Sequence, residues 1–234
     1  MNKKLLVIGC SFSKYKEYEK ILTWPKILSE KINWTIYNSS MQGNSLQNQI
    51  YQLDYYLKKY DFDFIIFQAT TALRGSYVID EKKYVKEMSN FRQLSENYFT
   101  NFYIYSYRYM YNFTASPMEG KDNREKKFIN MHLDNIAYNV NFFYPVFIGL
   151  LYEIYRRLQE SKIPYIYYCH LPLYASIESQ KKVVNFPHID FCLKEKLGEE
   201  KFNNFVVDNG NHFNKEGNYL LVNEYLYPLL LSKC

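Results

Sequence analysis

Short apolar runs alternate with amphipathic stretches along this chain, and that alternation limits the folds it can adopt. Residues 4–10 form an apolar run that ends in small residues, as a strand buried on both faces of a parallel sheet does. The same reasoning predicts further strands at 35–38, 62–68, 163–170 and 205–208. An N-cap residue, Thr23, and a proline in the first turn predict a helix start at 23–28, and apolar residues at helical spacing predict helices at 45–59, 147–158 and 216–231. Strands alternating with helices predict an α/β fold, a three-layer α/β/α sandwich with a mostly parallel, flavodoxin-like sheet.

The length of the chain favours one domain. The 234 residues suffice for a single α/β domain with a sizeable core, and two compact domains would fit only tightly. The stretch from about 75 to 145 is rich in Tyr and Asn and weakly periodic. We interpret it as an insertion or lid between the third and fourth strands, so residues 1–234 form one domain.

Charge and composition argue against several function classes. The net charge of +5 is spread thinly, and the short basic stretches sit beside acidic residues, which favours solvated helix faces over a nucleic-acid surface. Four cysteines without CxxC spacing and four scattered histidines give no pattern for a metal, and no cofactor is expected. No apolar run approaches the ~18 to 20 residues of a membrane span, and no signal-peptide pattern opens the chain. A cytoplasmic protein without membrane contact is the expectation.

Chemically useful residues follow the predicted strands. In open α/β sheets, ligands gather at the carboxyl ends of the strands, so these positions are the first to inspect. They carry Ser11 after the first strand, Gly43 and Asn44 after the second, Gln68, Thr70 and Arg74 at the third, and Asp208 and His212 past the fifth. A serine attacks a carbonyl, an imidazole removes its proton, and a carboxylate holds the imidazole. This set therefore suits acyl transfer.

Five segments of the chain resemble the conserved blocks of the SGNH/GDSL hydrolases, in the family order. Gly9-Cys10-Ser11-Phe12-Ser13 looks like the GDS block, and Thr23-Trp24-Pro25 resembles the tryptophan-proline helix often seen next. The remaining blocks are matched at 38–45, 63–68 and 212–218. No single block is specific, whereas five in order are.

The resemblance implies a role for each of these residues. Ser11 is the nucleophile, His212 is its base, and Asp208 orients His212. The oxyanion would be bound by the N–H groups of Ser11 and Gly43 and by Gln68. Candidate substrate contacts are Asn44, Thr70 and Arg74. Each has an alternative role: Asn44 as a turn residue, Thr70 as a second choice of oxyanion donor, and Arg74 as a member of a surface ion pair.

Three positions depart from the family pattern. Gln68 stands where the family has an asparagine, and its extra methylene requires a shifted backbone if it is to donate to the oxyanion. The acid usually stands three residues before the histidine, where this chain has Asn209, so Asp208 needs a bulged loop or Asn209 takes over as a neutral acceptor. Cys10 replaces an aspartate that is generally structural.

The resulting function is a metal-free serine esterase whose substrate is a small-molecule or carbohydrate ester, with O-acetyl removal from a sugar suggested by family habit alone. Two alternatives stay open: a carbohydrate O-acyltransferase of the same fold, and a catalytically silent domain that binds a glycan or a protein. His170 is interpreted as a satisfied buried histidine, and Ser13 as a cap or turn residue.

Overall fold

A mostly parallel sheet forms the centre of the molecule. The computed structural model describes residues 2–14, 22–41, 44–70, 74–78, 92–93, 99–101, 110–114, 140–171, 188–207 and 212–234. The central strands, in spatial order, are β2 (Thr35–Asn38), β1 (Lys4–Ile8), β3 (Phe64–Ala69), β8 (Tyr165–Cys169) and β9 (Phe191–Cys192), all parallel. Beyond β2 the sheet continues with β6 (Phe99–Asn101), which is parallel, and β5 (Arg92–Gln93), which is antiparallel. The central order matches the flavodoxin-like order 2-1-3-4-5 and confirms the predicted fold class.

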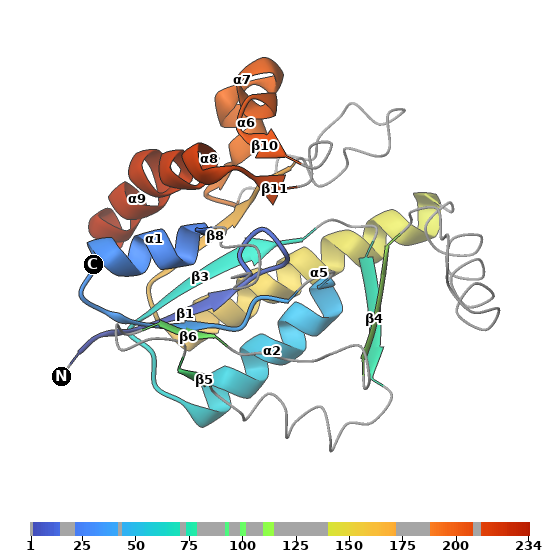
Figure 1. Ribbon diagram of the computed structural model, residues 1–234. Helices are drawn as coiled ribbons and strands as arrows, with labels where there is room; N and C mark the ends of the chain where they lie inside the picture. The colour runs from blue at the N-terminus through green and yellow to red at the C-terminus, as the bar shows by residue number, and fades with distance from the viewer. Residues whose placement is uncertain are drawn as a thin grey trace.

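Helices cover both faces of this sheet (Figure 1). One face carries α1 (Trp24–Lys31) and the C-terminal helical segment, which consists of α8 (Lys215–Leu220), the π-helical η4 (Leu221–Leu226) and α9 (Tyr227–Lys233). The other face carries α2 (Leu46–Lys59) and α5 (Val140–Ser161). The predicted helix starts are confirmed at both α1 and α2. Ser45 caps α2 by accepting a hydrogen bond from the Asn48 N–H, whereas Thr23 precedes α1 without a side-chain cap.

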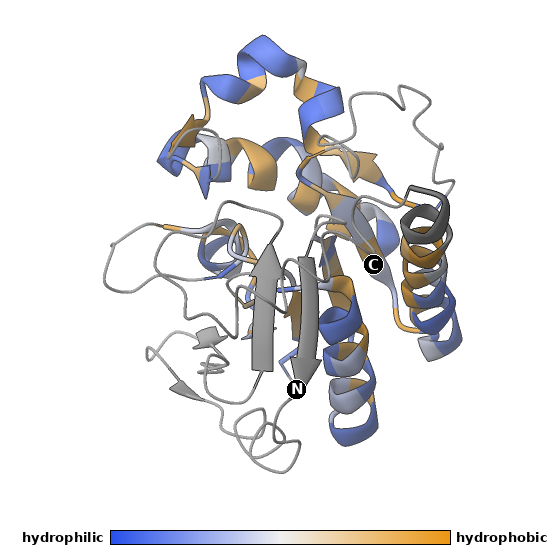
Figure 2. Cartoon of the chain, turned by 90° about the vertical axis from the view of Figure 1, so that its right-hand side faces the viewer, coloured by the Kyte–Doolittle hydropathy of each residue, from blue (hydrophilic) through white to orange (hydrophobic). Residues whose placement is uncertain are grey.

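Strand β1 shows how the sequence divides the core into two layers. Successive side chains of a strand point to opposite faces, so Leu6 and Ile8 pack toward α2 and α5 while Leu5 and Val7 pack toward α1 and the C-terminal helices. All four side chains are fully buried. The helices carry orange and blue stretches in Figure 2, as amphipathic helices on a buried sheet should. Apolar runs with no polar alternation are therefore the correct signal for these strands.

The fifth strand was predicted in the wrong place. Residues 205–208 were expected to join the main sheet, but β10 (Val206–Val207) pairs antiparallel with β11 (His212–Phe213) in a separate two-stranded sheet. The fifth central strand is β9, which has only two residues and therefore too little length for a recognisable apolar run. Two short helices, α6 (Leu193–Leu197) and α7 (Glu199–Asn203), connect β9 to β10.

The expected insertion contributes strands of its own. Between β3 and β8 in the sequence lie β5, β6 and the antiparallel pair β4 (Arg74–Val78) and β7 (Met110–Thr114). Because β6 pairs with β2, part of this stretch extends the main sheet. Its role as a lid stays a prediction. Within the described ranges, no helix combines the length and apolarity needed to cross a membrane.

Candidate active site

Ser11 lies in a tight turn directly after β1. The N–H groups of Ser13 and Lys14 both donate to the Cys10 carbonyl, at 3.0 and 3.1 Å, so the chain makes a helix-like turn around Ser11. The Ser11 residue is 6% exposed. A strand that passes abruptly into such a turn presents its first side chain at the carboxyl edge of the sheet, which is where a nucleophile needs to be.

The side chain of Gln68, at the end of β3, is hydrogen-bonded to this turn. Its Oε1 accepts hydrogen bonds from the Cys10 N–H at 2.9 Å and from the Ser13 hydroxyl at 3.1 Å. Its Nε2 donates to the Ala69 carbonyl at 2.8 Å. With 2% exposure, Gln68 in this arrangement braces the turn that carries Ser11. The expected donation to an oxyanion is not seen and stays a prediction.

Two asparagines, one at the end of β2 and one in the loop that follows it, hold the same turn. Asn38 Nδ2 donates to the Ser13 carbonyl at 2.8 Å, and Asn44 Nδ2 donates to the Gly9 carbonyl at 2.8 Å. The second bond of Asn44 Nδ2 goes to Gln52 Oε1 at 2.9 Å, and its Oδ1 accepts from Asn48 Nδ2 at 2.7 Å. Asn44 is 0% exposed and fully engaged inside the protein. Asn44 thus holds the loop in place, and the substrate contact expected of it stays a prediction.

His212 approaches Ser11 from the β10–β11 hairpin. Ser11 and His212 line one small hollow, together with Phe12, Lys14, Thr23, Phe213 and Asn218, and we call this the Ser11 hollow. The space accessible to water in it is about 10 Å³, near the minimum that holds one water molecule. The structure thus brings together the two residues on which the sequence hypothesis depends, although 201 residues separate them in the chain.

The Phe12 ring links His212 to a second histidine. Phe12 stacks on His170 with ring centroids 4.5 Å apart and lies 5.5 Å from the His212 ring. His170 is 1% exposed, and its Nε2 lies 3.4 Å from the Tyr168 hydroxyl. Burial first, and the proximity of His212 second, lower the pKa of His170 to about 3. The expected burial of His170 is confirmed, but among the described residues Nδ1 finds no hydrogen-bond partner.

The other predicted site residues lie outside this description or away from the hollow. Gly43 and Asp208, with its alternative Asn209, fall outside the described residues. Arg74 lies in β4, where only the backbone course is described. Thr70 is 1% exposed, and its N–H lies 3.3 Å from Gln49 Oε1. The proposed roles of these residues stay predictions.

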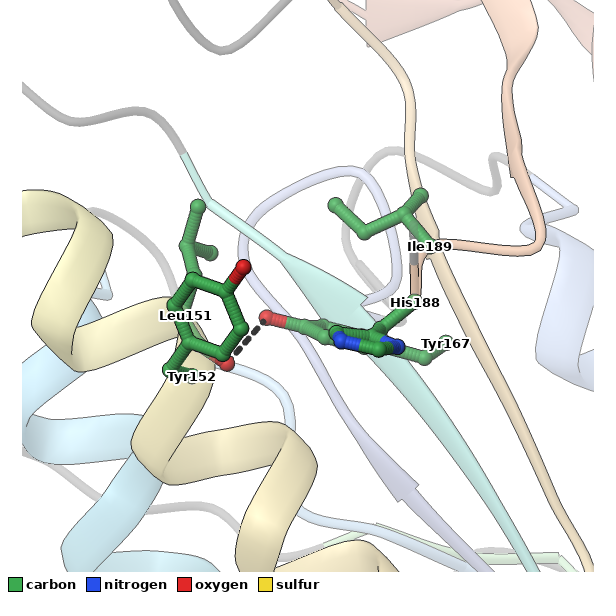
Figure 3. A pocket seen from close by; sticks show the side chains of 5 residues that line it. All are labelled: Leu151, Tyr152, Tyr167, His188 and Ile189. Carbon is green, nitrogen blue, oxygen red and sulfur yellow. Dashed lines mark hydrogen bonds between the residues drawn. The ribbon is translucent and has the colours of Figure 1, made fainter. Parts of the chain in front are cut away.

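Metal ligands do not gather in the part of the chain that the structure describes, where no group of three His, Cys, Asp or Glu side chains is found. A second hollow lies between α5 and the segment before β9 and is lined by Leu151, Tyr152, Tyr167, His188 and Ile189 (Figure 3). The Tyr167 hydroxyl points to the Leu151 carbonyl there, at 3.4 Å. Its lining side chains include no serine or cysteine, so this hollow is not an alternative site for a serine or cysteine nucleophile.

Phe12 and Asn218 line the Ser11 hollow, but the sequence motifs that contain them predict no role for either. Ser13, predicted as a cap or turn residue, does lie in the turn after β1, but the sequence does not predict the bonds of its side chain. Ser13 is 0% exposed and accepts a hydrogen bond from Trp24 Nε1 at 2.9 Å while donating to Gln68. The only available signal was the position of Ser13 two residues after the candidate nucleophile.

Comparisons with known proteins agree with the fold. No protein-family model matches the chain, and no curated protein sequence matches it. Among solved structures, the chain is similar to that of the psychrotrophic esterase EstA from a Pseudoalteromonas species, inhibited by monoethylphosphonate. The match covers 99% of this chain and 98% of that chain, with a TM-score of 0.52 and 13% sequence identity. The two chains share a fold.

Proposed function

We propose that this protein is a serine esterase of the SGNH type, with Ser11 as nucleophile and His212 as general base. The observation that carries the proposal is that Ser11 and His212 line the same hollow at the carboxyl edge of a parallel sheet. Support comes from the fold shared with EstA, which is described as an esterase. The order of the five sequence blocks supports the same assignment.

The chemistry follows from the two side chains. Ser11 Oγ attacks the ester carbonyl while His212 takes its proton, and the resulting tetrahedral intermediate expels the alcohol, to which His212 returns the proton. Water then attacks the acyl-enzyme with His212 again as base, which releases the carboxylic acid and free Ser11. We assign the orientation of His212 to Asp208, with Asn209 as the neutral alternative.

Two backbone N–H groups, those of Ser11 and Gly43, are the proposed oxyanion donors. Each preorganised donor is worth about 2.7 to 4 kcal/mol of barrier. Gln68 contributes by bracing the turn, because its Nε2 is directed at the Ala69 carbonyl and its Oε1 at two donors of the turn. A short acyl group, such as acetyl, is what the resemblance implies for the acid part of the ester. We also propose, from the resemblance alone, that the alcohol part of the ester is a carbohydrate.

Hydrolysis of p-nitrophenyl acetate and labelling with a fluorophosphonate test this assignment. Wild type is expected to turn over the ester and to be labelled at Ser11, while Ser11→Ala loses about 10³-fold or more in kcat and is not labelled. Ser232→Ala, a change at the far end of the C-terminal helix, is the matched control and is expected to behave as wild type.

Three outcomes separate the functions. Equal rates for wild type and Ser11→Ala, with no labelling at Ser11, would overturn the esterase and favour a silent binding domain. Transfer of the acetyl group to an added sugar faster than to water would favour the acyltransferase. Acetate release with an acetylated sugar as substrate would establish the carbohydrate esterase.

A further inference from the structure

A chain of buried hydrogen bonds connects the turn of Ser11 to the strand of His212. On the Ser11 side, Gln68 Oε1 accepts from Cys10 N–H and from Ser13 Oγ, and Ser13 Oγ accepts from Trp24 Nε1 at 2.9 Å. On the His212 side, Asn218 Oδ1 accepts from the Trp24 N–H at 3.0 Å. Trp24 thus belongs to both halves, through its indole and its backbone.

Asn218 forms the last hydrogen bonds of this series, next to His212. Its Nδ2 donates to the carbonyl of Phe213, the residue after His212, at 3.4 Å and to the Asn214 carbonyl at 2.9 Å. The bond to the Trp24 N–H joins positions 194 residues apart. The side chain of Asn218 therefore holds α1 and the segment after β11 at a fixed separation.

The side chains that make these hydrogen bonds are buried. Ser13 and Trp24 are 0% exposed, and Gln68 and Asn218 are 2% exposed. A buried amide that loses its partner leaves an unsatisfied polar group, which is costly, so each member has a strong preference for this one arrangement. Such a network specifies geometry more sharply than apolar packing does.

The two ends of this series of hydrogen bonds lie beside the two candidate catalytic residues. The series begins at Cys10, directly before Ser11, and ends at Phe213, directly after His212. Both Ser11 and Asn218 also line the Ser11 hollow. A misplacement of about 1 Å between reacting groups can cost roughly 100-fold in rate.

We propose that Asn218 is a positioning residue, which sets the distance between Ser11 and His212 by coupling the His212 segment to the Ser11 turn through Trp24 and Ser13. This inference rests on the proposed function. Asn218 does not touch the reacting atoms in this role. It acts through the backbone on either side of the two catalytic residues.

Asn218→Asp is the first test. The change keeps the oxygen that accepts from the Trp24 N–H and replaces the amino group that donates to Phe213 and Asn214. We expect kcat for p-nitrophenyl acetate to fall by about 10- to 100-fold, with KM within about twofold, and Ser11 labelling to slow in parallel. Asn214→Asp is the matched control, because it keeps the oxygen that caps α8 and removes only the Nδ2 that donates to the Asn204 carbonyl, a bond outside the path from Ser11 to His212.

Trp24→Phe provides a second, independent break. It removes the Nε1 donor to Ser13 and keeps an aromatic ring and the backbone N–H to Asn218. We expect a smaller loss of kcat, and less than additive losses in the double variant, because both changes interrupt one pathway. Far-UV circular dichroism and thermal unfolding check that each variant is folded.

The outcomes distinguish this inference from the proposed function. If wild type is labelled at Ser11 and Asn218→Asp matches Asn214→Asp in kcat and labelling rate, the positioning role is wrong and the esterase stands. If both Asn218→Asp and Trp24→Phe fail to fold, the chain of hydrogen bonds is a folding element and the inference is overturned. If wild type is neither active nor labelled, both proposals fall.

Discussion

The ring of Phe12, the residue directly after Ser11, stacks on the imidazole of His170 with centroids 4.5 Å apart and planes inclined by 26°. The same ring lies 5.5 Å from His212 and 5.9 Å from Phe213. Phe12 therefore stands between the two histidines and forms one wall of the Ser11 hollow. A side chain next to Ser11 thus helps to fix the imidazole that we propose as its base.

Phe12→Ala should lower both activity and stability. Removal of the ring deletes the aromatic contacts to His170 and His212, and because Phe12 is only half-buried we expect the free energy of unfolding to fall by about 1 to 3 kcal/mol. The rate of p-nitrophenyl acetate hydrolysis should fall about 10-fold, since His212 loses a wall that limits its orientations. Phe12→Leu keeps apolar bulk and should recover most of the stability. Urea unfolding and steady-state kinetics measure both effects, and an unchanged kcat in Phe12→Ala would contradict the role of the ring.

His170 makes stability depend on pH. Its pKa is lowered by burial to about 3, whereas in the unfolded chain it is near 6.5. Below pH 6.5 the unfolded state binds a proton that the folded state does not, so the free energy of unfolding falls as the pH drops from 6.5 toward 3. From pH 7.5 to 5.5 this group alone should remove about 1.4 kcal/mol.

Urea unfolding of wild type and His170→Gln at pH 7.5 and 5.5 tests this. The other titrating groups are common to both proteins, so the difference between the two pH dependences isolates His170. Wild type should lose more stability than His170→Gln on acidification. Equal losses would show that folding does not lower the pKa of His170.

The four cysteines should differ in reactivity according to their burial. Cys10, Cys169 and Cys192 are 2%, 3% and 9% exposed, whereas Cys234 is exposed at the C-terminus. A hydrogen bond from Cys169 lowers the pKa of Cys192, but a thiolate reacts only if the reagent reaches it. We expect one thiol to react rapidly with Ellman's reagent under native conditions and the other three only in denaturant. Cys234→Ser should abolish the rapid phase. A rapid phase that persists would show that Cys192, in the edge strand β9, becomes accessible to the reagent.

The strands of the sheet centre were predictable because they are buried on both faces. Such strands show unbroken apolar runs, and those that became β1, β3 and β8 were identified with errors of at most two residues at their ends. The misplaced fifth strand has an equally physical cause. Val206 and Val207 are β-branched and favour extended structure, but pairing with His212 and Phe213 is local and needs no place in the main sheet.

The candidate site was predictable only in part. Ser11 and His212 could be named because strand ends and motif spacing are local features of the sequence. The side chains that support them join positions 11 to 194 residues apart, as in the bonds from Trp24 to Ser13 and from Trp24 to Asn218. No periodicity marks such pairs, because they depend on which strand ends and helix starts meet in the folded chain.

Gly9 offers a final test of how tightly this support is built. An added Cβ at Gly9 would stand 2.7 Å from Ser13 Oγ and 2.9 Å from Gln68 Oε1, closer than such atoms approach. Gly9→Ala must therefore displace two members of the buried hydrogen-bond chain, and we expect it to lower the free energy of unfolding by about 1 to 3 kcal/mol and to slow the labelling of Ser11. Gly149→Ala is the matched control, since a Cβ there meets nothing within 4 Å inside α5. That change should raise the free energy of unfolding by about 0.5 to 1 kcal/mol, because alanine favours a helix interior over glycine. Urea unfolding of both variants separates the steric demand at the Ser11 turn from the intrinsic effect of a methyl group, and a Gly9→Ala protein as stable as wild type would show that the turn has room to yield.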